Sequence, residues 1–460
     1  MALSATQGER MIRNFNLQAK RFGVLTGSLL GGAALYVLLM GNVAAPELAD
    51  ASKAALRSAS GAPQLVAVAP LQAMDGEMCE WMPASVESSL MAALQQDRAQ
   101  SGAVIAKSPA SVAIEREPVR QIRDTYPTFS AIAQDARTGD IFMQDENLFG
   151  IRVFDRLDNT PPNAAFTEPK RYLGGHNTKL EFNCGLYIDP KTGDIYSVNN
   201  DTTDTLVIFE ANAKGDVPPD RELRTPHGTY GIAVDEGKQE MYLTVEHTNA
   251  IAVFNKYAQG TDKALREIRG LSTHLADPHG VSLDIKNQLI LVTNHGNTLE
   301  GQNPTYGKFI PPAITVYPMS AKGDIAPLRT ISGAKTMLNW PAHIWVDEGR
   351  GEFYVANDAD HSILVFGIED QGDVAPRRMI RGANTQLRNP MGVFVDLQND
   401  ELWVSNMGNH RATVYPRTAN GNVAPKRVIR SAPQGKIAQA IGNPGAVGYD
   451  SKREQVLVPN

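Results

Sequence analysis

Apolar runs separated by polar turns recur at regular intervals through most of this chain. Seven times between residues 135 and 450 an apolar run ends in Asp and is followed by a polar turn and a second apolar run; all but the last repeat add a third. The anchoring aspartates lie 46 to 63 residues apart: Asp135, Asp189, Asp235, Asp284, Asp347, Asp396 and Asp450. Repeats of about this length are typical of propeller blades.

The fifth repeat shows the unit most clearly. Its three runs, residues 343–347, 352–357 and 362–366, are rich in β-branched and aromatic residues and are separated by Gly, Asp and Asn. This composition favours strands joined by tight turns. A fourth run follows at residues 377–381, after the turn at residues 372–376. Each repeat therefore predicts a four-stranded blade.

The two ends of the repeat region predict how the ring closes. The last repeat stops after its second run, at residues 455–460, whereas residues 111–114 and 118–123 have the pattern of a third and a fourth strand. Pairing these segments would complete a blade and remove the exposed strand edges. The prediction is an all-β, seven-bladed β-propeller over residues 111–460.

Some of the repeats resemble a known family. Residues 389–396 (NPMGVFVD) followed by residues 402–406 (LWVSN) are similar to NHL repeats, and the similarity covers about residues 111–460. The resemblance implies a β-propeller. It implies no single activity, because NHL-type and related propellers include ligand-binding scaffolds, protein- and RNA-binding modules, lactonase-like enzymes and lyases.

Residues 1–45 have the character of a membrane-targeting segment. Residues 22–40 carry no charge and follow Arg10, Arg13, Lys20 and Arg21. Nineteen uncharged residues can just span a bilayer, and the small residues at 43–45 resemble a signal-peptide cleavage site. Because Pro46 would obstruct cleavage there, an uncleaved anchor is the favoured interpretation and a signal peptide the alternative. The positive flank stays in the cytoplasm, which predicts an extracytoplasmic, periplasmic ring, either anchored to the inner membrane or secreted.

Residues 46–110 are rich in Ala, Ser, Pro and Gln and predict a flexible stalk with one short helix at about residues 83–98. The only two cysteines are Cys79 in this stalk and Cys184 in the ring. They could pair in an oxidising compartment. The net charge of −6 argues against a nucleic-acid partner, which would require a basic face.

The histidines are the candidate functional residues. All nine fall in or beside the loops that join a fourth strand to the next blade or a second strand to a third. Because these loops emerge on one face of a propeller, the sequence predicts a histidine-rich face around the mouth of the central channel. Imidazole can ligate a transition metal, move a proton near neutral pH or hydrogen-bond a polar ligand. Ordinary turn residues are the alternative interpretation.

The candidate residues follow from this placement. The predicted binding residues are His227, Glu246, His247, His279, His295, His343, Tyr306 and Lys308, of which His227, His279 and His295 are the candidates for a divalent metal. Tyr306 and Lys308 belong to an insertion at residues 298–312 that could act as a lid or docking surface. Polar residues closing the second strands, Asp145, Asn200, Asn294, Asn357, Asn406 and Asn460, are expected to be turn residues, or a polar collar if they point inward.

Three functions are compatible with these features. The favoured one is a membrane-tethered extracytoplasmic propeller whose histidine-rich face binds a protein or a small molecule. The second is a metal-assisted enzyme that resembles streptogramin-lyase or lactonase-like propellers, in which His279 and His295, or His227 with Glu246, position a divalent ion. The third is a metal-holding accessory protein.

Overall fold

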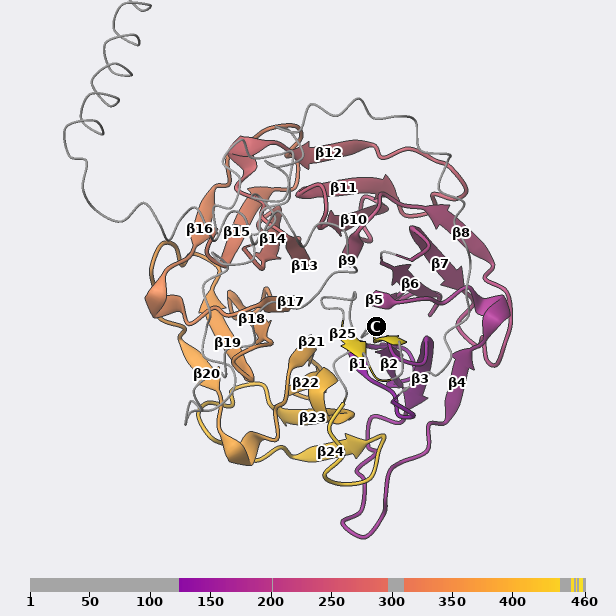
Figure 1. The fold of residues 1–460 in the computed structure, drawn as a ribbon. Coiled ribbons are helices and arrows are strands. Elements are labelled where there is room, and N and C mark those ends of the chain that lie inside the picture. The colour runs from indigo at the N-terminus through magenta and orange to yellow at the C-terminus, as the bar shows by residue number, and fades with distance from the viewer. Residues whose placement is uncertain are drawn as a thin grey trace, which may run out of the picture. The chain divides into compact units, whose positions relative to one another are not determined.

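The computed structural model describes residues 124–200, 202–296, 310–438, 448–450, 452 and 455–457. These residues form an all-β propeller in which six four-stranded antiparallel sheets surround a central channel (Figure 1). In each blade the first strand lies nearest the channel and the fourth lies at the rim. Alternating apolar residues and Gly, Asp or Asn turns favour these short strands, as the sequence predicts.

The strands follow the chain order within each blade. Blade 1 contains β1 (Phe129–Gln134), β2 (Ile141–Asp145), β3 (Gly150–Phe154) and β4 (Arg171–Gly174). Blade 2 contains β5 (Asn183–Ile188), β6 (Ile195–Asn199), β7 (Thr205–Phe209) and β8 (Arg221–Arg224). Blade 3 contains β9 (Thr229–Asp235), β10 (Glu240–Val245), β11 (Ala250–Asn255) and β12 (Arg266–Arg269).

The second half of the ring has the same organisation. Blade 4 contains β13 (Pro278–Asp284), β14 (Leu289–Asn294), β15 (Ala313–Pro318) and β16 (Arg329–Ile331). Blade 5 contains β17 (Pro341–Asp347), β18 (Glu352–Asn357), β19 (Ser362–Gly367) and β20 (Arg378–Ile380). Blade 6 contains β21 (Pro390–Asp396), β22 (Glu401–Asn406), β23 (Arg411–Pro416) and β24 (Arg427–Arg430). Short 3-10 turns join several strands: η1 (His176–Thr178), η2 (Leu271–Thr273), η3 (Ala334–Thr336), η4 (Ala383–Thr385) and η5 (Met407–Asn409).

The prediction of seven blades is wrong, because blade 1 packs directly against blade 6. Strand β1 contacts both β5 and β21. Polar contacts reinforce this closure: Gln134 Nε2 donates to Asp396 Oδ2 at 2.9 Å, and Arg156 Nη1 lies 3.4 Å from Glu401 Oε2. The repeat around Asp450 forms a two-stranded sheet, β25 (Gly448–Asp450) with β26 (Gln455–Leu457), which no other described strand joins. Six blades therefore close the ring without it.

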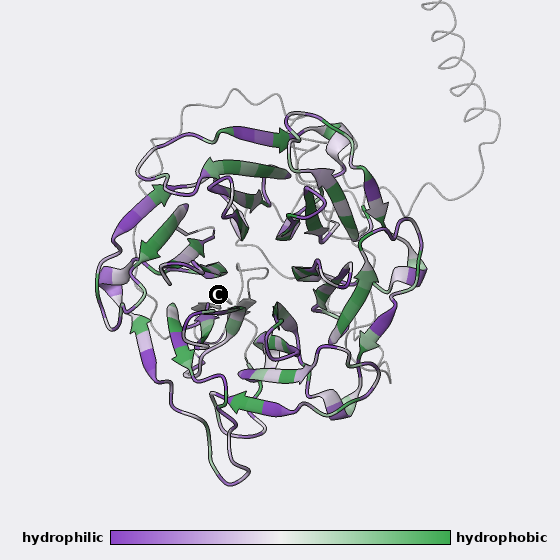
Figure 2. Ribbon diagram, turned by 180° about the vertical axis from the view of Figure 1, so that it is seen from behind, coloured by the Kyte–Doolittle hydropathy of each residue, from purple (hydrophilic) through white to green (hydrophobic). Residues whose placement is uncertain are grey.

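The hydrophobic core lies between neighbouring blades. Side chains of the second and third strands are almost all buried, and those of adjacent sheets pack into shared clusters such as the one that joins blades 2 and 3. Rim strands alternate hydrophilic and hydrophobic residues (Figure 2). Their arginines reach back across the blade to a second-strand glutamate in the pairs Arg266–Glu240, Arg378–Glu352 and Arg427–Glu401.

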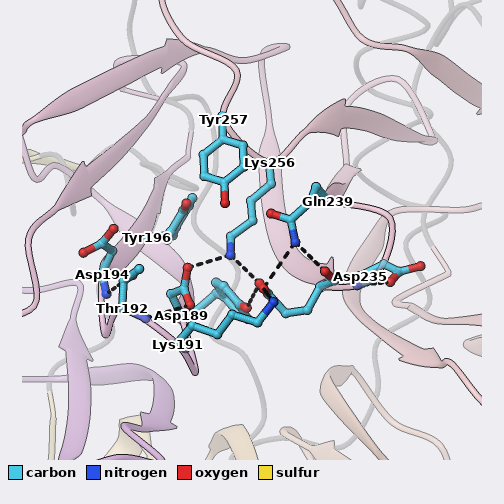
Figure 3. Close-up of polar contacts among 12 residues, drawn as sticks. Asp189, Lys191, Thr192, Asp194, Tyr196, Asp235, Gln239, Lys256 and Tyr257 are labelled. Atoms are coloured by element: carbon cyan, nitrogen blue, oxygen red, sulfur yellow. Dashed lines mark hydrogen bonds and ion pairs between the residues drawn. The ribbon is translucent and has the colours of Figure 1, made fainter.

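Buried ion pairs also join neighbouring blades, on the side where the anchoring aspartates lie. Lys256, which follows β11, is 1% exposed and extends back to blade 2, where its Nζ donates to Asp189 Oδ2 at 2.6 Å (Figure 3). It also pairs with Glu236 of its own blade. Arg417 occupies the same position in blade 6 and lies 2.8 Å from Asp347 of blade 5. Both cations therefore fasten a blade to the one before it.

Several predictions fall outside the described residues. These are the membrane-targeting segment at residues 1–45, the stalk at residues 46–110 with Cys79, the strands at residues 111–123, and the insertion residues Tyr306 and Lys308. Within the described part of the chain, no helix has the length and apolar character needed to cross a membrane. Cys184 is fully buried in the ring, with its Sγ 3.8 Å from the carbonyl oxygen of Tyr230.

Candidate functional site

The polar residues that close the second strands hold neighbouring loops in place. Asn294 Oδ1 accepts the Ala276 N–H at 3.0 Å, and its Nδ2 donates to Thr315 Oγ1 at 3.1 Å. The structurally equivalent amides are Asn199, Asn357 and Asn406, and Asp145 accepts the Thr128 N–H in the same way. In blade 2 the closing residue is therefore Asn199 and not Asn200, and these side chains are not the polar collar.

The residues immediately after the second strands form the collar instead. In every blade this residue donates its N–H to a carbonyl oxygen just before the first strand, at 2.7 to 3.0 Å. The six residues, here called the channel collar, are Glu146, Asn200, Glu246, His295, Asp358 and Met407. The five polar members are all buried, with exposed fractions of 2% to 8%. The ring thus surrounds its channel mouth with buried polar groups.

A second layer of the site comes from bulges near the start of the inner strands. Each first strand has one more residue than the second strand at this point, and the residues at these bulges include Cys184, Tyr230 and His279. The next residue is Ala or Gly in five blades: Ala131, Gly185, Gly231, Gly280 and Gly392. In blade 5 it is His343.

His343 uses the space that the small residues leave open. Its Nε2 lies 3.1 Å from the carbonyl oxygen of Cys184, on blade 2, and its ring centroid lies 5.6 Å from that of Tyr230 on blade 3. The side chain therefore bridges the channel. On one side of it is the collar, and on the other is a cavity of about 400 Å³ lined by the inner strands, with Trp345 and Phe394 among its walls.

Blade 4 brings two imidazoles and a carboxylate together at the collar. The rings of His279 and His295 are stacked, with centroids 3.3 Å apart. Asp277 approaches both, with Oδ1 3.7 Å from His279 Nδ1 and Oδ2 3.9 Å from His295 Nδ1. Glu246 of blade 3 lies on the other side of His279, with Oε1 2.8 Å from Nε2. One ligand-type atom from each of Asp277, His279 and His295 lies within 4.8 Å of the others.

The three channel histidines differ in charge state because their partners differ. Burial lowers the pKa of His279, but the carboxylates of Glu246 and Asp277 outweigh burial and raise it to about 9. Burial lowers the pKa of His295 well below its ordinary value, and electrostatic interactions with the imidazoles of His279 and His343 lower it further. Burial and the charge of His279 lower the pKa of His343 to about 4. At neutral pH His279 is therefore the cation and the other two are neutral.

Burial raises the pKa values of two collar carboxyls, whereas it lowers those of the histidines. Burial, with the nearby charges of Asp145 and Asp358, raises the pKa of Glu146 to about 8. Burial raises the pKa of Asp358 to about 6, against the opposing effects of Asn389 and His279. Burial is also the main reason why the pKa of Tyr230 is raised well above its ordinary value, and Glu146, Glu246 and Asp358 contribute. Carboxyls from blades 1, 3 and 5 are therefore all close enough to affect the pKa of one residue, Tyr230.

The other predicted residues lie away from this cluster. His227 is exposed and pairs with Asp204, its Nδ1 2.8 Å from Oδ1, and its ring lies against that of His247 with centroids 4.6 Å apart. The structure therefore does not place His227 with His279 and His295. His410 is fully buried, where its Nδ1 donates to the carbonyl oxygen of Pro127 at 2.7 Å.

Sequence reasoning missed four members of the site: Glu146, Tyr230, Asp277 and Asp358. The signal for Asp277 lies two residues before His279 in the motif Asp277-Pro278-His279-Gly280. Aligning the repeats one residue beyond each second-strand end would have found Glu146 and Asp358. Tyr230 has no such signal, because its role depends on the bulge that turns it toward the channel.

Comparisons with known proteins give little beyond this geometry. No family model matches the chain, and no curated protein matches it. Among solved structures, a functionally unknown protein from Desulfotomaculum acetoxidans is 13% identical, with 68% of this chain and 89% of that chain covered and a TM-score of 0.45. Kuenenia stuttgartiensis hydrazine synthase is 12% identical, with 75% and 98% covered and a TM-score of 0.45. At this level of similarity neither protein informs the site, and the β-propeller assignment comes from the strand order and the ring itself.

Proposed function

We propose that this protein is a binding module that holds a ligand at the channel collar, on a propeller of NHL-type repeats. The observation that carries the proposal is the buried polar chemistry of the collar, where three of six equivalent positions are carboxyls. A buried carboxyl without a charge partner destabilises the folded state. Perturbed titratable groups gathered in one space are typical of functional sites.

The chemistry of the collar suggests what the ligand carries. Glu146 and Asp358 are close enough for the charge of Asp358 to raise the pKa of Glu146. Asp358 Oδ1 is buried without a hydrogen-bond partner among the described residues. Carboxyl oxygens accept hydrogen bonds and attract positive charge. A ligand with hydrogen-bond donors or a cationic group, either a small molecule or a short segment of a partner protein, would satisfy them.

We also propose that residues 22–40 tether the ring to a membrane and that the ring lies outside the cytoplasm. The support is the uncharged run of nineteen residues after Arg10, Arg13, Lys20 and Arg21. A tether would confine the collar to ligands near the membrane surface. Protease protection in spheroplasts and intact cells would establish on which side the ring lies.

The double variant E146Q/D358N tests the binding function. Full-length protein without a His tag is purified from detergent-solubilised membranes and examined by native mass spectrometry and by identification of co-purified proteins. We expect a bound small molecule or a stoichiometric partner with the wild-type chain and at least a tenfold loss with the variant. The variant should fold normally, because the amides remove only buried titratable groups.

A matched control lies on the face of the propeller opposite the collar. Lys238, in the turn between β9 and β10, is 46% exposed at its side chain, and K238Q should retain whatever the wild type binds. Equal retention by E146Q/D358N and K238Q, or an empty wild-type collar, would contradict the proposed function.

A second candidate function, metal-assisted catalysis by a lyase or lactonase-like enzyme, is favoured by one observation. Asp277, His279 and His295 offer three ligands at the collar, and three protein ligands leave coordination positions open for a water or a substrate. This function depends on the metal site that is argued next.

A further inference from the structure

We infer that Asp277, His279 and His295 form a binding site for one divalent first-row transition metal ion at the channel collar. This inference rests on the proposed binding function, because it names one ligand of the same collar. Two imidazole nitrogens and a carboxylate are a ligand set that suits zinc, iron(II) or cobalt. Magnesium and calcium prefer an all-oxygen set.

The separations of the ligand atoms support the site. In a tetrahedral zinc site with bonds of about 2.0 to 2.1 Å, neighbouring ligand atoms are about 3.3 Å apart. The two nitrogen–carboxylate separations are 3.7 and 3.9 Å, with Asp277 presenting a different oxygen to each ring. Small side-chain rotations therefore bring the three groups to coordination distance. The stacked rings would tilt apart so that each in-plane lone pair points at the ion.

A second, independent observation is the state of His295. This side chain is 6% exposed, and its Nε2 is buried without a hydrogen-bond partner among the described residues. Its Nδ1 lies 3.9 Å from Asp277 Oδ2, which is beyond hydrogen-bond distance. Leaving a buried polar group unsatisfied costs about 1–3 kcal/mol. Among the described residues His295 therefore has an unused ring nitrogen, which a ligand at the collar would engage.

The surroundings of His279 also suit a metal ligand. Glu246 lies 2.8 Å from Nε2. The carbonyl oxygen of Asp277 lies 3.1 Å from Nδ1, so a metal ion that binds Nδ1 would displace the proton that Nδ1 donates to this carbonyl. A metal-bound histidine usually donates its other N–H to a carboxylate, which fixes the ring. Glu246 is placed to be that partner from the neighbouring blade. The backbone at Asp277 has a φ of +54°, a conformation that Asn and Asp adopt more readily than most residues.

Cobalt(II) is the probe that tests the site. Tag-free full-length protein in detergent is stripped with chelator and titrated with Co²⁺ under anaerobic conditions, with equilibrium dialysis for stoichiometry and visible absorption for coordination geometry. We expect one ion per chain, and a d–d spectrum of a four- or five-coordinate site with nitrogen and oxygen ligands. Trp340, whose ring centroid lies 5.1 Å from that of His295, should lose fluorescence as the ion binds.

Variants separate this site from other metal-binding surfaces. D277N, H279Q and H295Q should each weaken Co²⁺ binding by at least about 100-fold, and E246Q, which changes the partner of a ligand, by about 10- to 100-fold. H227Q is the matched control, because His227 is exposed and pairs with Asp204 instead. It should bind Co²⁺ as the wild type does. Since a variant could simply unfold, each is also checked for cooperative thermal unfolding without metal, and only the wild type and H227Q should gain the full stabilisation that bound metal gives.

Two results would overturn the inference: a wild-type chain that binds less than half an equivalent of Co²⁺, or D277N, H279Q and H295Q variants that bind like the wild type. The E146Q/D358N variant keeps all three metal ligands, so it should still bind Co²⁺. A collar that loses its native ligand in that variant but never takes up metal would leave the binding function intact and reject only the metal site.

Discussion

Single buried residues determine the chemistry of the channel mouth. Glu146, Asp358 and Glu246 come from three different blades, yet each is less than 10% exposed. Among the described residues, Glu246 is the one of the three with a cationic partner, His279, at ion-pair distance. Burial therefore keeps Glu146 protonated at neutral pH, where it can donate a hydrogen bond, while Asp358, whose pKa burial raises to only about 6, is mostly ionised. The collar thus presents carboxyls in two protonation states to one ligand.

The raised pKa of Glu146 predicts a pH-dependent stability difference. An unfolded Glu ionises near pH 4.5, whereas folded Glu146, beside Asp145 and Asp358, has a pKa of about 8. Between these values the unfolded state loses the proton first, so this group makes the wild type less stable as the pH rises. E146Q should match the wild type near pH 4.5 and exceed it by at least about 1 kcal/mol at pH 8.5.

Urea denaturation across this pH range measures the effect. The control is the Glu210→Gln change, at an exposed residue, which should change the stability little. A constant offset for E146Q at every pH would show that Glu146 does not titrate in the way its burial implies.

Two cations that directly follow a third strand join neighbouring blades through ion pairs. Lys256 and Arg417 occupy the same position in blades 3 and 6, and each pairs with the anchoring aspartate of the preceding blade. Lys256 is the more buried of the two, because the rings of Tyr187 and Tyr257 lie near its ammonium group. A buried, fully paired ion contributes more to specific blade packing than an exposed one.

Replacing Lys256 should reveal this contribution. K256M leaves Asp189 and Glu236 without their shared cation, and removing one partner of a buried pair costs about 3–5 kcal/mol. K256M/D189N should recover part of that loss, because it also removes one of the stranded charges. K238M, at an exposed lysine, should cost less than about 1 kcal/mol. Chemical denaturation of the three variants gives their free energies of unfolding. If K256M loses no more stability than K238M, the ion pairs of Lys256 do not hold blades 2 and 3 together.

The sequence predicted the blade unit because the interactions that define it are local. Asp235 Oδ1 accepts hydrogen bonds from the N–H groups of Gly237 and Lys238, two and three residues ahead. The turn after each first strand therefore requires an Asp at a fixed position in the repeat. The same register led to the selection of His279 and His295, whose rings the structure stacks against each other. Asp277 was visible in the motif but was not selected.

Contacts between distant residues were beyond the sequence pattern. The closing pair Gln134–Asp396 joins residues 262 positions apart, and no periodicity distinguishes a seventh blade from a separate pair of strands. The convergence of Glu146 and Asp358 depends on that same closure. Likewise, His343 could be placed near the channel, but its reach to the carbonyl oxygen of Cys184 depends on small residues in the other five blades.

For the molecule as a whole, the closure of blade 1 against blade 6 decides which side chains share the channel mouth. Six blades place Glu146 of blade 1 two blades away from Asp358 of blade 5, with only Met407 of blade 6 between them in the collar. A seventh blade would separate them further and would also part β1 from β21. The binding proposal therefore depends on the number of blades.

Cross-linking between Q134C and D396C tests this closure most directly. The native side chains meet at 2.9 Å in the six-bladed ring, so a short thiol-specific cross-linker should join the two cysteines within one chain, and peptide mass spectrometry should identify the product in high yield. The control pair Q134C/E236C, from blades 1 and 3, should not react. Efficient cross-linking of Q134C/D396C is the predicted result, and its absence in a correctly folded variant would contradict the six-bladed ring and the collar built on it.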